Sequence, residues 1–268
     1  MTIHRAFRVA QLAFLLGVLG SSGGLLVQAI AAPPAPDSMA EARQNPLDLF
    51  AAEKAGQIEV GLIPRDEKRV TLIVTNKGDK PLAIRIPDAF AGAPVLAQIG
   101  LNPAGNGNNN NARAPQALGV GGPGGQPFGQ NNNFNNNGVG FPGGIMNVPP
   151  GKTVKVRLPA VCLEYGKPTP YPHAPYAAVP LETVSSDPAV KTVVASLGAG
   201  SSDQRIAQLA AWNLANGKSW ESLAAIPVAR IGGRKIPEYK EEEIEAAQEL
   251  VTAVKKKIAP AAKATAAK

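Results

Sequence analysis

The chain has 268 residues, of which 44% are hydrophobic and only 5% aromatic. This content is enough for one or two modest cores, while 28 glycines and 25 prolines place much of the length in turns, linkers or disorder. A single cysteine excludes an internal disulfide and any zinc site built from several cysteines. The formal charge of +7 suits an anionic partner, but the basic residues are scattered along the sequence, which argues against specific nucleic-acid binding.

Residues 1–32 have the features of a secretory signal peptide. Basic residues within the first eight positions precede the apolar run Val9–Leu19, and small residues before position 32 offer cleavage sites. The alternative is an uncleaved membrane anchor, but Ser21–Gly24 interrupts the run and leaves it short for a membrane span. We therefore expect cleavage, no membrane span afterwards, and an exported protein of the periplasm or cell surface.

Residues 33–56 are predicted to hold an N-terminal helix. Asn45 can cap a helix whose first residue is Pro46, and Gly56 can end it. We expect this helix to pack against the domain that follows.

Four runs of alternating apolar residues predict β-strands. Three lie within residues 57–99, and the fourth, Thr153–Leu163, places Cys162 on its apolar side. Such alternation is typical of antiparallel sheets with one face in water. We therefore predict an α+β protein in which residues 57–99 and 148–165 form a small antiparallel β-sandwich of the Ig-like type. The apolar positions of the first three runs are Ile58, Val60, Leu62, Val70, Leu72, Val74, Leu82, Ile84 and Ile86.

Two segments of unusual composition flank the fourth run. Residues 100–147 are rich in glycine and asparagine, with Arg113 as the only charged residue. They cannot bury enough apolar surface to offset chain entropy, so we expect a disordered insertion in one loop, with self-association through asparagine as the alternative. Residues 166–186 form a proline-rich connector, which is expected to be extended; the alternative is recognition by a proline-binding partner.

Residues 187–259 are predicted to be a helical segment. Asp187 and Pro188 favour the start of one helix, which Gly198 can end. Ser201–Gln204 is a capping box for a second helix, which ends near Gly217.

The last helix, about Glu238–Ile258, has the most regular apolar spacing in the chain. Glutamates in its first turn and lysines in its last turn complement the helix dipole. Pro260 is expected to end the helix, and residues 260–268 to form a disordered tail.

No strong catalytic or metal-binding motif occurs in the sequence, so we expect a protein that is not an enzyme, with no catalytic residue, metal or cofactor. Hydrolysis is the lowest-ranked of three functional hypotheses. Cys162 would supply its nucleophile and His173 its base. The cysteine, however, falls on the predicted buried face, where a thiol tends to be inert.

A lone cysteine is unusual in an exported protein, because oxidising compartments favour pairs. A cysteine that closes a strand, followed later by the helical motif Gln208-Leu-Ala-Ala-Trp212, resembles bacterial surface thioester domains. This resemblance implies that Cys162 supplies the thiol and Gln208 the acyl group of an internal thioester that captures an amine. The spacing between the two motifs is shorter than that family's, and the proline-rich connector is foreign to it.

The segments NKGDKPLAIRIPDAF, VCLEYGKPTP and AQLAAWNLANGKSWESLAA resemble exported proteins of planctomycete-type bacteria, a resemblance that implies export but no activity. Two functional hypotheses follow. The first is a non-enzymatic binding or structural protein of the cell envelope or periplasm, with an unknown envelope protein or an anionic polymer as partner. The second is covalent attachment through a thioester between Cys162 and Gln208.

Overall fold

The computed structural model of the chain describes residues 36–95, 114–123, 144–229 and 235–266. Pro33–Lys268 form one compact unit, and the expected signal peptide lies outside the described residues. No helix in the described ranges is both long enough and apolar enough to cross a membrane.

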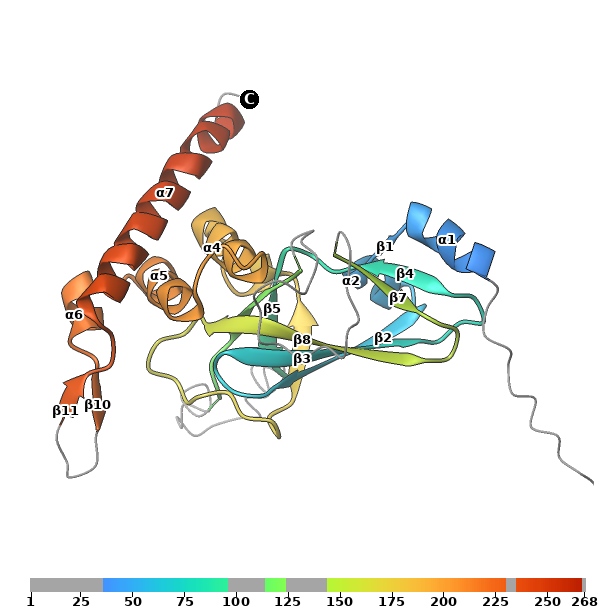
Figure 1. The fold of residues 1–268 in the computed structure, drawn as a ribbon, viewed down its shortest axis with the longest axis horizontal. Helices are drawn as coiled ribbons and strands as arrows, with labels where there is room; N and C mark the ends of the chain where they lie inside the picture. The colour runs from blue at the N-terminus through green and yellow to red at the C-terminus, as the bar shows by residue number, and fades with distance from the viewer. Residues whose placement is uncertain (1–35, 96–113, 124–143, 230–234, 267–268) are drawn as a thin grey trace, which may run out of the picture. The chain divides into compact units, whose positions relative to one another are not determined.

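Within the described ranges, six strands close into an antiparallel barrel (Figure 1). β9 (Tyr176–Val179) closes it, because it pairs with β5 (Ala89–Pro94) along its length and meets β2 (Ile58–Pro64) where Tyr176 lies opposite Leu62. The expected open Ig-like β-sandwich is therefore wrong. Around the barrel, the order is β2 (Ile58–Pro64), β3 (Arg69–Asn76), β8 (Thr153–Cys162), β6 (Leu118–Gly121), β5 (Ala89–Pro94) and β9 (Tyr176–Val179).

The three strands that complete the barrel lack the alternating pattern of the others. All six residues of β5 are buried, so its sequence shows no polar face. β6 is half glycine and lies inside residues 100–147, where we expected disorder; that expectation is corrected for residues 114–123. β9 lies inside residues 166–186, the expected connector, between Pro175 and Pro180. The expectation of disorder is also corrected for residues 145–147, which belong to β7 (Ile145–Val148). Apart from Gly144, the remainder of the expected insertion lies outside the described residues.

A separate small sheet lies beside the barrel. It contains β1 (Leu47–Asp48), β4 (Leu82–Arg85) and β7 (Ile145–Val148), so the third predicted strand run belongs here and not to the barrel. The expected helix start at Asn45 is also wrong. α1 (Pro36–Gln44) ends before Asn45, and α2 (Leu49–Lys54) starts after Asp48, whose carboxylate accepts from the backbone N–H groups of Phe50 and Ala51 at 3.0 Å each.

The helical segment follows a short 3₁₀ helix, Leu181–Thr183. Asp187 caps α4 (Pro188–Gly198), as predicted, by accepting from the N–H of Ala189. Asp203, not Ser201, caps α5 (Gln204–Asn216), and Gly217 ends it with a φ of 62°. Ser219 caps α6 (Trp220–Ala224), and β10 (Pro227–Ala229) pairs with β11 (Lys235–Pro237).

α7 (Glu241–Ala266) runs further than expected. Its backbone stays helical through Pro260, so the expected stop at that residue is wrong, and the predicted disordered tail is helical up to Ala266. Proline lacks an N–H and therefore removes one helical hydrogen bond, but the flanking alanines and lysines favour helix strongly enough to continue it.

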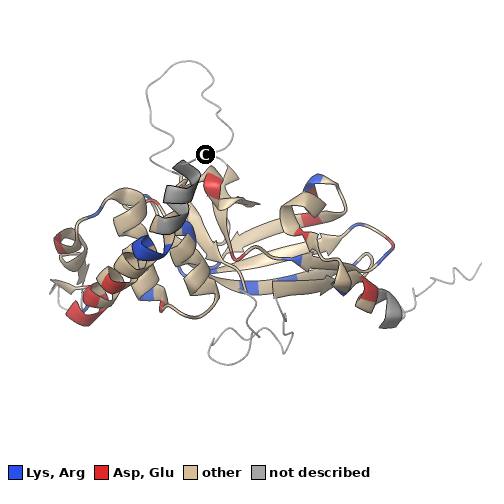
Figure 2. Cartoon of the chain, turned by 90° about the horizontal axis from the view of Figure 1, so that it is seen from above, with Lys and Arg blue, Asp and Glu red and all other residues tan. Residues whose placement is uncertain are grey.

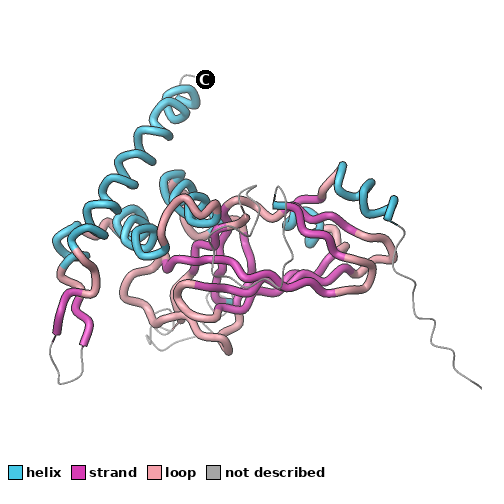
Figure 3. The backbone as a smooth tube through the Cα atoms, in the orientation of Figure 1, coloured by secondary structure: helices cyan, strands magenta, loops and turns pink. Residues whose placement is uncertain are grey.

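The described residues form three apolar clusters: one inside the barrel and under α2 and the small sheet, one between the barrel and α4, α5 and α7, and one among α5, α6 and α7. Figure 3 shows the helices in cyan and the strands in magenta. Side chains of a strand alternate between its two faces. At the end of β8, Cys162 accordingly belongs to the interior cluster, while its neighbours Val161 and Leu163 belong to the cluster shared with α4, α5 and α7. Both faces of β8 are therefore buried at this end.

Candidate functional site

Cys162 and Gln208, which are 46 residues apart in sequence, lie in direct contact where β8 meets α5. The backbone N–H of Cys162 donates to Oε1 of Gln208 at 2.8 Å, and Nε2 of Gln208 donates to the carbonyl oxygen of Cys162 at 2.9 Å. The two residues are only 2% and 4% exposed. The residues named by the thioester resemblance are thus brought together, through the backbone of the cysteine.

The register of the barrel explains this contact. β3 pairs with β8 only as far as Arg69, which lies opposite Pro159. Beyond that point the edge of β8 has no strand partner on the β3 side, and a buried peptide group without a partner is costly. The side-chain amide of Gln208 takes the place of the missing strand at Cys162.

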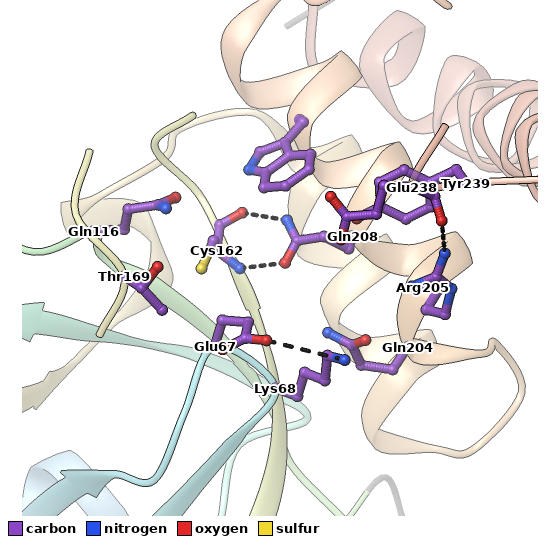
Figure 4. A pocket seen from close by; sticks show the side chains of 11 residues that line it. Glu67, Lys68, Gln116, Cys162, Thr169, Gln204, Arg205, Gln208, Glu238 and Tyr239 are labelled. Carbon is purple, nitrogen blue, oxygen red and sulfur yellow. Dashed lines mark hydrogen bonds and ion pairs between the residues drawn. The ribbon is translucent and has the colours of Figure 1, made fainter. Parts of the chain in front are cut away.

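The sulfur of Cys162 does not face this amide. Figure 4 shows it on the opposite side of the cysteine from Gln208, toward Thr169 and Gln116. Burial raises the pKa of the Cys162 thiol to about 12, and the carboxylate of Glu67 adds to the shift. The thiol is therefore protonated and weakly nucleophilic at neutral pH.

The structure does not assemble the other candidate pair. His173 is exposed in the proline-rich connector, whereas Cys162 is buried, and the described residues show no hydrogen bond between them. No cluster of histidine, cysteine and carboxylate side chains that could hold a metal ion occurs in the described part of the chain.

A cavity of about 210 Å³ lies beside Cys162, between the barrel and α5. Its walls come from the loop before β3, the segment before β6, the end of β8, the connector, α5 and the segment before α7, so residues far apart in sequence form it (Figure 4). The lining residues are Glu67, Lys68, Gln116, Cys162, Thr169, Gln204, Arg205, Gln208, Trp212, Glu238 and Tyr239.

Both cations that line the cavity are held in ion pairs. Arg205 donates to both carboxylate oxygens of Glu243, at 2.5 and 3.0 Å, and stacks 4.5 Å from the ring centroid of Tyr239. This contact raises the pKa of Arg205 and lowers that of Glu243, because each charge stabilises the other. Lys68 lies 3.9 Å from the carboxylate of Glu67. In Figure 2, acidic and basic residues occur on strands and helices alike.

Two residues that line this cavity each carry a buried polar atom without a hydrogen-bond partner among the described residues: Oε1 of Gln116 and Nε1 of Trp212. Sequence reasoning missed Gln116, because it lies in residues 100–147, where we expected disorder. The signal that could have found it is the apolar pair Leu118 and Val120, which alternates with glycine just after it.

The chain matches no protein-family model, no curated protein and no solved structure. The resemblances to planctomycete-type exported proteins and to thioester domains therefore remain predictions that rest on the quoted motifs alone.

Proposed function

We propose that this protein is a non-enzymatic binding protein of the cell envelope or periplasm. The observation that carries the proposal is the cavity between the barrel and α5, which is lined mainly by polar side chains. In a concave site, convergent polar groups fix the orientation of the ligand and provide specificity. Export to the envelope rests on the signal-like sequence of residues 1–32 and is part of the proposal.

The state of the candidate reactive groups supports binding over catalysis. A nucleophilic thiol needs a lowered pKa and access to substrate, whereas the Cys162 thiol is buried and its pKa is raised. A hydrolase also needs a base within hydrogen-bond reach of its nucleophile, and His173 is exposed in the connector.

Blocking the cavity tests the proposed function. Thr169 lines the cavity and is exposed, so Thr169→Trp should fill the mouth without disturbing the core. We expect this variant to lose a ligand that the wild-type chain retains from envelope extract, as identified by mass spectrometry. Tyr171→Trp is the matched control, because Tyr171 is 51% exposed in the same connector and does not line the cavity. Equal retention by all three proteins would contradict the proposal.

Covalent attachment is a second candidate function, favoured by the contact between Cys162 and Gln208. The thiol would attack Cδ of Gln208, the Cδ–Nε2 bond would break, and the thiol proton would leave with the nitrogen as ammonia. An amine of the target would then attack Cδ, forming an amide and restoring the thiol. The backbone N–H of Cys162 already donates to Oε1 of Gln208 and would polarise this carbonyl.

The intact mass of the mature protein decides this second candidate. A thioester makes the chain lighter by one ammonia, and the deficit should vanish in Cys162→Ala and on treatment with methylamine. A wild-type mass that equals the sequence mass, together with thiol labelling only after denaturation, would show that Gln208 serves the structure alone.

A further inference from the structure

A second concave site, a groove of about 470 Å³, lies where α6 meets the first turns of α7 (Figure 1). It shares only Tyr239 with the cavity beside Cys162. Its volume falls within the roughly 300–1,000 Å³ of sites for drug-sized ligands. The groove can therefore take one long side chain together with part of the backbone that carries it.

One part of the lining is apolar. Trp220 and Ala224 come from α6, Pro237 from the end of β11 and Ile244 from α7. The indole of Trp220 packs against the cluster between the barrel and the helices and against the cluster among α5, α6 and α7, so its position is fixed. The aliphatic stem of a long side chain can lie along such a surface while its polar end stays in water.

Three carboxylates line the same groove. Glu221, Glu241 and Glu245 are exposed, and none of them forms an ion pair with a described residue. No lysine, arginine or histidine of the described ranges lines the groove, although the whole chain carries a formal charge of +7. Glu241 and Glu245 lie one turn apart on α7, where two like charges destabilise a helix. A bound cation would relieve this repulsion, and a bound anion would increase it.

The chain places cations over aromatic rings at two other positions. Arg205 lies 4.5 Å from the ring centroid of Tyr239. Lys218 lies 4.3 Å from that of Tyr165. Tryptophan is the best ring for this contact, and no cation among the described residues covers the ring of Trp220. The groove thus combines an uncovered indole with carboxylates that lack a counter-ion.

We propose that this groove binds a basic side chain, lysine or arginine, of a partner protein. The stem of that side chain lies against Trp220 and Pro237, and its charge lies beside the carboxylates of Glu241 and Glu245. The exposed carboxylates stand at the surface, so the side chain enters while most of the partner's backbone stays outside. The groove is separate from the proposed binding cavity, and the inference therefore goes beyond the proposed function.

Two tripeptides test the requirement for charge. The probe is N-acetyl-alanyl-lysyl-alanine amide, and in the matched probe norleucine replaces lysine, which keeps the four-carbon stem and removes the ammonium group. Binding is followed by the two indole N–H signals in the ¹H–¹⁵N spectrum of the labelled mature chain, since Trp220 lines the groove and Trp212 does not. We expect the lysine probe to move the Trp220 signal far more than the Trp212 signal. It should bind roughly three- to thirty-fold more tightly than the norleucine probe.

Removing two carboxylates tests their part in this preference. In the double variant Glu241→Gln with Glu245→Gln, we expect the advantage of lysine over norleucine to fall to about two-fold or less. The matched control is Glu242→Gln with Glu249→Gln, which removes the same charge from exposed positions of α7 that do not line the groove. The control should keep most of the advantage. An equal loss in both double variants would overturn the inference.

Other occupants would give different results. Equal binding of the two tripeptides by the wild-type chain would show that the groove takes apolar side chains without regard to charge. A Trp220 signal that moves when the free chain is diluted, together with a concentration-dependent mass in sedimentation, would make the occupant a second copy of the chain. Either result would overturn the inference.

This test is separable from the test of the proposed function. Thr169→Trp blocks the cavity beside Cys162 and leaves the groove unchanged, so the lysine probe should still move the Trp220 signal in that variant. A shift that Thr169→Trp abolishes would place the probe in the cavity. That result would overturn the inference and leave the proposed function in place.

Discussion

At the scale of single residues, two glutamines on α5 act as a substitute for a strand. Nε2 of Gln204 donates to the carbonyl of Ala160 at 3.3 Å, and Gln208 bonds both backbone groups of Cys162. Four helical residues rise roughly 6 Å, and two strand residues rise roughly 6.8 Å. This near match allows glutamines one turn apart to serve alternate peptide groups along the free edge of β8.

Replacing Gln208 tests this role. Gln208→Leu leaves a buried N–H and a buried carbonyl of Cys162 without partners, so we expect the free energy of unfolding to fall by about 2–4 kcal/mol. Gln204→Leu is the matched control on the same helix. We expect it to lower the free energy of unfolding by about 1 kcal/mol or less, because it removes only the longer hydrogen bond to the carbonyl of Ala160. Urea unfolding measures both. Similar losses for the two variants would contradict the larger contribution that we assign to the two bonds of Gln208.

At the scale of elements, glycines let α4 approach the barrel closely. A Cβ added to Gly198, at the end of α4, would lie 2.0 Å from the carbonyl oxygen of Gly122, just after β6. A Cβ on Gly121 would lie 2.4 Å from the backbone nitrogen of Gly198. Backbone therefore packs directly on backbone here. Gly198, predicted as the end of this helix, also lets α4 pack closely against the backbone of the barrel.

Gly198→Ala should therefore be strongly destabilising. We expect a loss of about 2–3 kcal/mol, because the clash involves backbone atoms that cannot rotate away. Gly61→Ala on β2 is the control, since its added Cβ would meet only Cβ of Ile73 at 3.6 Å, an ordinary contact. Thermal unfolding of the two variants measures the difference, and a Gly198→Ala protein as stable as Gly61→Ala would show that α4 can move away at little cost.

The ion pair between Arg205 and Glu243 joins α5 to α7 and makes their packing depend on pH. Hydrogen bonding from Arg205 holds the pKa of Glu243 below its ordinary value of 4.5. The pair therefore stabilises the fold above the unfolded-state pKa, and this contribution disappears as the pH falls through the lowered folded-state pKa.

We expect Glu243→Gln to lower the free energy of unfolding by about 1 kcal/mol at pH 7 and to leave it almost unchanged at a pH below the folded-state pKa of Glu243. The value at pH 7 is modest because the side chains of Arg205 and Glu243 are both partly exposed. Urea unfolding at the two pH values measures the change. Glu242→Gln, an exposed substitution in the same turn of α7, controls for the general loss of charge. A cost for Glu243→Gln that does not vary with pH would mean that packing, not ionisation, sets its contribution.

At the scale of the whole molecule, closure of the barrel brings distant parts of the chain to one cavity. β9, within the proline-rich connector, completes the ring between β5 and β2, and the part of the connector before β9 supplies Thr169 to the cavity wall. The segment before β6 supplies Gln116 to the same wall. The cavity therefore exists only in the closed barrel with α5 packed against it.

Export is the whole-molecule prediction that the sequence makes. We expect the native chain, expressed in a bacterium, to appear in the exported fraction with its N-terminus cut after Ala29 or Ala31, since small residues at these positions suit signal cleavage. N-terminal sequencing checks the cut, and a chain that lacks residues 1–32 should stay in the cytoplasm. An intact Met1 in the membrane fraction would show instead that the segment is a retained anchor.

The sequence by itself determined the elements that depend on local spacing. The alternation in β2, β3 and β8, the cap at Asp187 and the burial of Cys162 could all be predicted, because each follows from a period or a cap within a few residues. The resemblance to thioester domains also named Cys162 and Gln208 together, although their contact runs through the backbone and not the sulfur.

Only the tertiary structure decided the barrel, the role of Gln208 and the cavity. β5 and β6 consist of small or fully buried residues without a polar face, so they lack the alternation of apolar and polar residues that marks the other strands, and the alternation of Leu118 and Val120 with glycine is the one local signal of β6. The partners of Gln208 and Gln116 are peptide groups that lie 46 to 52 residues away in the chain. Hydrogen bonds to the backbone leave no pattern in the sequence, because every residue type presents the same carbonyl group.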